Sequence, residues 1–127
     1  MMKKTICIIL LLFICGCSAN QWNRHEMYFG LSKDGGRAQV TEQEWQSFLK
    51  DEISPEFSAG LTVIDGQGFW HEDGRVYDEK SKMVIIYAPA SAKDTMDKMT
   101  RIADKFKKQH QQQNILVTSS EAEVYFK

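Results

Sequence analysis

The chain has almost no cysteine. Its three cysteines, Cys7, Cys15 and Cys17, all lie near the N-terminus, so the rest of the chain contains no thiol. This absence excludes a disulfide, a thiolate-bound metal and a cysteine nucleophile from the chain after Cys17. The fold must therefore rest on an ordinary hydrophobic core, and roughly a hundred residues are enough to build one.

Three further classes of site have no support in the sequence. His25, His71 and His110 are scattered, and none has a second histidine at the i, i+4 spacing that places two imidazoles on one metal. Gly66 and Gly68 lie in an expected strand with no helix after them, so they do not form a phosphate-binding loop. A formal net charge of -1 disfavours nucleic acid as a partner. We therefore expect no metal, no cofactor and no nucleic acid.

The chain also lacks a hydrophobic run long enough to cross a membrane. The apolar stretch 6–14 covers about half of the ~20 residues that a transmembrane helix needs. Lysines precede this stretch and small residues follow it, which is the order of a secretory signal. The stretch 14–17 (Ile-Cys-Gly-Cys) resembles the lipobox of bacterial lipoproteins, whose last cysteine is acylated. The resemblance implies that residues 1–16 are a signal peptide and that Cys17 carries the lipid.

An acylated Cys17 implies a membrane-anchored protein, because two or more acyl chains anchor stably. The alternative is an ordinary cleaved signal with an unrelated cysteine. Residues 17–26 are expected to be the lipidated cysteine and a polar tether, and residues 27–127 a single domain. Ser18 is typical of Gram-negative lipoproteins that are transferred to the outer membrane. We therefore expect a protein of the outer membrane that faces the periplasm.

Local patterns in 27–127 predict strands and helices in alternation. Strands are expected at 27–31, 61–71, 75–87, 115–118 and 122–126, the last two separated at Ser119-Ser120. Thr41 and Glu44 form a capping box for a helix that extends to Ile53. Ser91 is the expected cap of a second helix, whose apolar positions continue to Phe106.

Two glycine-containing motifs refine this pattern. Gly66 and Gly68 suggest a bulge or a close backbone approach in their strand, and Asp73-Gly74 is a strong hairpin signal. The resulting order matches a ferredoxin-like βαββαβ sandwich, an α+β fold in which two helices pack on one face of an antiparallel sheet. Residues 83–87 are continuously apolar, so both faces of that strand are expected to be covered. A second copy of the domain, packed sheet against sheet, would cover the other face and give a homodimer.

Several short motifs carry a resemblance to a known family. They are residues 28–30 (Tyr-Phe-Gly), residues 60–65 with Gly68 and Trp70, and Glu79 with Ser81-Lys82. Together they resemble the hallmark pattern of the bacterial domain-of-unknown-function family 3574. The resemblance extends from Tyr28 to Phe126. It implies an exported domain of the predicted fold and implies no mechanism.

Five residues are candidates for binding: Tyr28, Asp65, Trp70, Glu79 and Lys82. They place polar, charged or aromatic groups in or beside otherwise apolar strands near the hairpin. Solvated strand ends are the alternative explanation. Glu79 and Lys82 cannot share a strand face, because their separation is odd. No residue is assigned a catalytic role.

Three functions are compatible with these observations. The first is a non-enzymatic envelope module that contacts another envelope protein or its own copy through the sheet face or the hairpin 70–75. The second is a small enzyme with a pocket between sheet and helices, lined by Tyr28, Asp65, Trp70 and Glu79; fold analogy alone supports it. The third is a prophage or plasmid surface lipoprotein that blocks an outer-membrane receptor.

Overall fold

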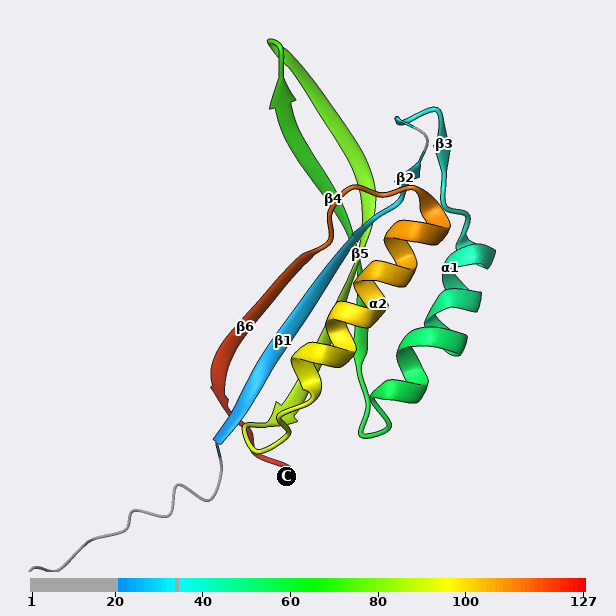
Figure 1. Ribbon diagram of the computed structural model, residues 1–127. Helices are drawn as coiled ribbons and strands as arrows, with labels where there is room; N and C mark the ends of the chain where they lie inside the picture. Colours follow the sequence, from blue (N-terminus) through cyan, green and yellow to red (C-terminus); the bar gives the residue numbers. More distant parts are fainter. Residues whose placement is uncertain (1–20, 34) are drawn as a thin grey trace, which may run out of the picture.

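Strand β1 (Gln21–Gly30) is one of the two interior strands of the four-stranded sheet. The computed structural model describes residues 21–33 and 35–127, and it pairs β1 with β5 (Arg75–Pro89) and β6 (Leu116–Glu123) (Figure 1). Both pairings are antiparallel. Because β1 is hydrogen-bonded along both edges, it joins the early and late parts of the chain in one sheet.

The remaining elements complete the predicted architecture. Strand β4 (Thr62–Glu72) pairs antiparallel with β5, which gives the order β4-β5-β1-β6. A small ribbon of β2 (Ser32–Lys33) and β3 (Ala38–Gln39) follows β1. Helices α1 (Glu42–Phe48) and α2 (Thr95–His110) cover one face of the sheet (Figure 1). Apart from the small ribbon the order is βαββαβ, so the ferredoxin-like α+β fold is confirmed.

Helix α1 begins at the predicted capping box. The Thr41 hydroxyl accepts a hydrogen bond from the Glu44 amide at 3.1 Å, and the Glu44 carboxylate accepts one from the Thr41 amide at 2.7 Å. Lys33 donates to the same carboxylate at 2.9 Å. These donors, Lys33 first, lower the pKa of Glu44 to about 2. The helix continues as a π-helical turn (Leu49–Ile53) and then a 3-10 turn (Ser54–Glu56).

Helix α2 begins later than the sequence predicts. The expected cap, Ser91, lies outside the helix, which starts at Thr95 with Asp94 in the capping position. Asp94 makes no side-chain cap bond and pairs with Lys98 at 3.1 Å. The Thr95 hydroxyl donates to the Ala92 carbonyl at 3.0 Å, which closes the preceding turn. The start of α2 is therefore set by this turn, and the prediction for Ser91 is wrong.

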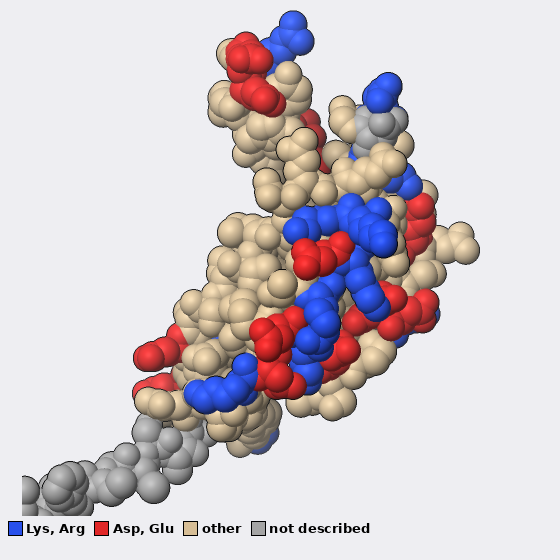
Figure 2. Space-filling view, in the orientation of Figure 1, with Lys and Arg blue, Asp and Glu red and all other residues tan. Residues whose placement is uncertain are grey.

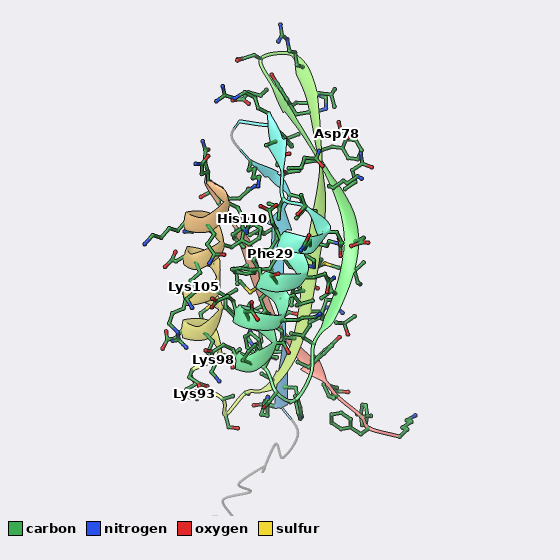
Figure 3. The ribbon with its side chains drawn as sticks, turned by 90° about the vertical axis from the view of Figure 1, so that its right-hand side faces the viewer. Phe29, Asp78, Lys93, Lys98, Lys105 and His110 are labelled. Atoms are coloured by element: carbon green, nitrogen blue, oxygen red, sulfur yellow. The ribbon has the colours of Figure 1, made fainter. Side chains whose placement is uncertain are left out.

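The core lies between the sheet and the helices and consists largely of aromatic rings. Phe106 of α2 contacts Phe29 of β1 and Phe48 of α1, with ring centroids 4.9 and 5.0 Å away. Trp45 packs on Phe29 at 5.2 Å. His110 extends the cluster 4.6 Å from Phe106, between the two layers (Figure 3). Burial lowers the pKa of His110, which favours the neutral imidazole.

The β4–β5 hairpin projects beyond both helices (Figure 1). Its turn is Asp73-Gly74 as predicted, and both residues have positive φ, 48° and 73°. Pairing runs without interruption from Thr62 opposite Ile85 to Glu72 opposite Arg75. Of the two alternatives for Gly66 and Gly68, the bulge is wrong, since a bulge would have shifted this register. The close approach is found at Gly66, where the Ser81 hydroxyl lies 3.0 Å from the position that a Cβ would take.

Two other predictions about strand limits are wrong. Strand β1 begins at Gln21, so residues 21–26 belong to the sheet and not to a tether. Strand β6 is continuous through Ser119 and Ser120, which pair with His25 and Arg24. Pairing with the interior strand β1 outweighs the weak strand preference of these polar residues.

Replacing Phe106 with alanine should test the aromatic core. The substitution leaves a cavity among Phe29, Phe48 and His110, so the free energy of unfolding should fall by about 3–5 kcal/mol. Met96→Ala on the outer side of the same helix is the matched control and should change it by less than about 1 kcal/mol. Urea unfolding followed by circular dichroism measures both, and equal losses would contradict the placement of this core.

Replacing Glu44 with glutamine should reveal a pH-dependent contribution to stability. The folded-state pKa of Glu44 lies at about 2, below its ordinary value, so the ionised carboxylate stabilises the fold at neutral pH. This contribution should be complete above about pH 4.5 and should disappear as the pH falls toward 2. Urea titrations at several pH values should show the difference between the native chain and Glu44→Gln shrinking over this range. A difference that stays constant with pH would contradict the assigned partners.

Candidate functional site

The five residues predicted to bind a ligand lie in three separate places. Tyr28 lies on the sheet face that the helices leave uncovered, which we call the open face. Asp65 and Lys82 face each other in register on the helix side of the sheet. Trp70 and Glu79 line a cleft beside the projecting hairpin.

The open face carries a row of apolar side chains across all four strands. Ile64, Met83, Tyr28 and Leu116 are successive partners in the register of β4, β5, β1 and β6. Ile64 is 42% exposed and Leu116 is 59% exposed, so nothing in the described part of the chain covers the ends of this row. Tyr87, farther along β5, is 40% exposed. The expectation that 83–87 is covered on both sides is therefore met at Ile85 and not at Tyr87.

A hydrogen-bonded polar network lies on the open face next to this row. The Tyr28 hydroxyl and the Arg24 Nε both donate to the Glu26 carboxylate, the latter at 2.6 Å. A second nitrogen of Arg24 donates to the Tyr87 hydroxyl at 3.0 Å. The hydrogen bond from Tyr28 and then the one from Arg24 lower the pKa of Glu26, and the same Glu26 contact raises the pKa of Tyr28. The charges of this network are thus compensated within one chain.

Arg24 and Glu26 are not among the binding residues predicted from the sequence. Both lie in the segment that was expected to be a tether, and their charges obscured the strand pattern. The signal that identifies them is alternation: His25, Met27 and Phe29 are buried, while Arg24 and Glu26 face the other way.

Asp65 and Lys82 form an ion pair at the first turn of α1. The Lys82 ammonium donates to Asp65 at 2.6 Å and to Glu42 at 2.7 Å. Burial would lower the pKa of Lys82, but the hydrogen bonds to these two carboxylates outweigh it and raise the pKa. Because Glu42 is the first residue of α1, the contact ties that helix to β4 and β5. The role that this geometry supports is structural.

The cleft beside the hairpin has a volume of about 890 Å³. It lies between the hairpin, the β2–β3 ribbon and the segment after α2, and Figure 2 shows the gap between the two projections. We call it the hairpin cleft; its lining includes Ser32, Lys33, Trp70, Glu72, Tyr77, Asp78, Glu79 and residues 111–114. Trp70 stacks on Tyr77, with centroids 5.5 Å apart and planes 14° from parallel.

Gly30 leaves space for the carboxylate of Glu79, which lines this cleft. Glu79 accepts a hydrogen bond from the Ser32 amide at 3.1 Å. Its Oε1 lies so close to Gly30 that a Cβ at that position would be 2.4 Å away. A side chain on Gly30 would therefore displace the Glu79 carboxylate, which explains the glycine of the motif at residues 28–30.

The outer surface of the helices differs from both of these surfaces. Figure 2 shows basic and acidic side chains interspersed over it. The pairs include Lys98 with Asp94 at 3.1 Å, Lys107 with Asp104 at 2.9 Å, and Lys105 with Glu52. Such mixed charge is typical of a solvated helix surface and points to no ligand of one sign.

The residues expected to line one pocket between sheet and helices do not come together. Asp65 borders a cavity of about 560 Å³ with Glu42 and Lys82 beside α1, whereas Trp70 and Glu79 border the hairpin cleft. Tyr28 faces away from the helices, and the space between the layers is filled by the rings around Phe29 and Phe106. Within residues 21–33 and 35–127, no cluster of histidine, cysteine or acidic side chains has the geometry to hold a metal ion. In the same segments, no helix has the length and apolar character needed to span a membrane.

Solved structures with a similar fold include enzymes and proteins named for ion tolerance. A phage SAM lyase in complex with S-methyl-5'-thioadenosine has a TM-score of 0.60 and 14% identity, covering 79% of this chain and 81% of that one. The same kind of lyase in its apo state also scores 0.60, with 18% identity and coverages of 78% and 79%. The periplasmic divalent cation tolerance protein CutA from Archaeoglobus fulgidus scores 0.51 at 12% identity, with coverages of 84% and 88%. At these identities the likeness shows the shared fold alone.

Sequence comparison assigns the family. No curated protein matches the chain. The family model described as "Protein of unknown function (DUF3574)" matches residues 24–126, which is nearly the whole described domain and confirms the resemblance seen in its motifs. The chain therefore belongs to the DUF3574 family.

Proposed function

We propose that this protein is a membrane-anchored module of the bacterial cell envelope that binds a second copy of itself through the open face. The observation that carries the proposal is the apolar row from Ile64 to Leu116, whose two ends are exposed and whose inner members are half-buried. An apolar patch that crosses a whole sheet is unusual on a protein that works alone, and its removal from water favours association.

The area of the open face suits a homodimer. Four strands at ~4.8 Å spacing are about 19 Å wide, and the ten residues of β1 are about 33 Å long. Packing two such faces would bury about 600 Å² on each copy, or about 1,200 Å² in all. This total is at the lower end of the range for specific interfaces, about 1,200–2,000 Å².

The charges of the open face also favour a second copy as the partner. Arg24 and Glu26 already neutralise each other, and Tyr28 and Tyr87 complete their hydrogen bonds. A partner of strong charge would find no unpaired group to bind in this network. A twofold axis instead sets the same apolar row against itself, which is the usual arrangement in homodimers.

The anchor in this proposal is Cys17, which lies outside the described residues. Because β1 begins at Gln21, four peptide units connect the cysteine to the sheet, and they reach at most about 14 Å. The domain would therefore rest directly at the outer membrane, on the periplasmic side. Anchoring to one surface raises the effective concentration of copies, which promotes pairing through an interface of modest size.

Leu116→Glu should prevent self-association. It places a charge at the exposed end of the row, where pairing would bury it without a partner. Sedimentation velocity of the full chain in detergent should show a dimer for the native protein and a monomer for this variant. Met96→Glu on the exposed side of α2 is the matched control and should remain dimeric. A native protein that stays monomeric at every concentration would overturn the proposed partner.

Cys17→Ser should abolish lipid attachment. Cells expressing the full chain and labelled with radioactive palmitate should lose the label on this variant, and the protein should leave the membrane fraction. Cys15→Ser is the matched control, since it removes a neighbouring thiol and should keep both label and sedimentation. Equal labelling of Cys17→Ser and the native chain would rule out the proposed anchor.

A further inference from the structure

The hairpin cleft offers an aromatic surface that the fold itself does not use. Trp70 and Tyr77 stack on each other across the two strands of the hairpin, and they are 41% and 37% exposed. The hairpin projects beyond the helices, so these rings contribute nothing to the core (Figure 1). Aromatic rings with a polar edge, held in a concave site, are typical of ligand contact.

The same cleft holds carboxylates in fixed positions. The Glu79 carboxylate accepts a hydrogen bond from the Ser32 amide and occupies the space that a side chain on Gly30 would fill. Asp78, on the projecting hairpin (Figure 3), accepts a hydrogen bond from Gln67 at 2.6 Å. These contacts hold the two carboxylates in place before a ligand binds. Less side-chain conformational entropy is then lost on binding.

Amide side chains line the opposite wall. Gln111, Gln113 and Asn114 follow the end of α2, and each amide provides both donors and acceptors. The side chain of Gln112, the residue after Gln111, donates a hydrogen bond to the Ser32 carbonyl of β2. This bond holds the segment 111–114 beside β2. A ligand that satisfies carboxylates and amides together must itself carry both donors and acceptors.

The charge of the cleft narrows the class of ligand. Among the described residues that line the cleft, three carboxylates, those of Glu72, Asp78 and Glu79, accompany one ammonium, that of Lys33. Phosphates and other anions are therefore repelled. A cation would suit the carboxylates but would gain no contact from the amide donors of the opposite wall, which would stay hydrated. An uncharged molecule rich in hydroxyl groups satisfies both walls.

We propose that the hairpin cleft binds an uncharged oligosaccharide. The apolar face of a sugar ring lies against Trp70 and Tyr77, and its hydroxyl groups donate to Glu79 and exchange hydrogen bonds with Asn114. The volume of about 890 Å³ accommodates a few sugar units. This inference goes beyond the proposed function, because the cleft is a different surface from the apolar row of the open face.

Calorimetric titration of the full chain in detergent tests this site. The probes are tetramers of glucose and of N-acetylglucosamine, and at least one should bind. Trp70→Ala should weaken that binding roughly tenfold or more, which corresponds to ~1.4 kcal/mol. Phe69→Ala is the matched control, because Phe69 is an exposed ring on the same hairpin outside the cleft, and it should bind as the native chain does.

Gly30→Ala provides a second variant that keeps every cleft side chain. Its Cβ displaces the Glu79 carboxylate, so sugar affinity should also fall several-fold. Circular dichroism identifies a variant that fails to fold, and Trp70→Phe, which retains a ring, should recover part of the affinity lost in Trp70→Ala.

Three outcomes would overturn the inference. These are no heat with either tetramer, equal affinity of Trp70→Ala and the native chain, and binding of polylysine in place of the sugars. Retention of the protein on insoluble chitin is measured in parallel. Retention would indicate a polymeric glycan as the source of the sugar, and binding of the tetramers alone would indicate a free oligosaccharide. Leu116→Glu should bind sugar normally, so failure of the dimer and failure of this site would be seen separately.

Discussion

The alternation of side chains along β1 is the constraint on which the rest of the structure depends. Met27 and Phe29 point into the core, whereas Glu26 and Tyr28 point to the open face. Both edges of β1 are paired, so a slip of one residue would expose the aromatic core and bury an ion-paired network. One strand therefore fixes both the layer that holds the helices and the surface that we propose as the interface.

The sequence predicted the features that depend on local chemistry. The capping box at Thr41 and the turn at Asp73-Gly74 are set by a few neighbouring residues, and both were found. Counting outward from that turn also places Asp65 opposite Lys82, so their ion pair was available from the sequence once the hairpin was placed. The odd separation of Glu79 and Lys82 likewise places them on opposite faces, as the structure has them.

Features that depend on distant partners could not be predicted in this way. The polar ends of β1 and β6 are strands because each pairs with the other, and neither segment has the composition of a strand. The sequence left open whether Gly66 marks a bulge or a close approach, and only the pairing with Ser81 decides for the close approach, since the Ser81 hydroxyl lies 3.0 Å from where a Gly66 Cβ would be. The hairpin cleft joins β2, the hairpin and the end of α2, so only the folded chain brings its walls together.

The position of β1 also relates the two proposed surfaces to the membrane. The N-terminal end of β1 and the C-terminus lie at one end of the sheet, and the hairpin projects from the other (Figure 1). A lipid on Cys17 would therefore hold the hairpin end away from the bilayer, because the connection to Gln21 is too short to let the domain turn over. The open face would stand beside the anchor, where a neighbouring copy is available. The hairpin cleft would face outward, where a glycan of the envelope can reach Trp70 without contact with lipid.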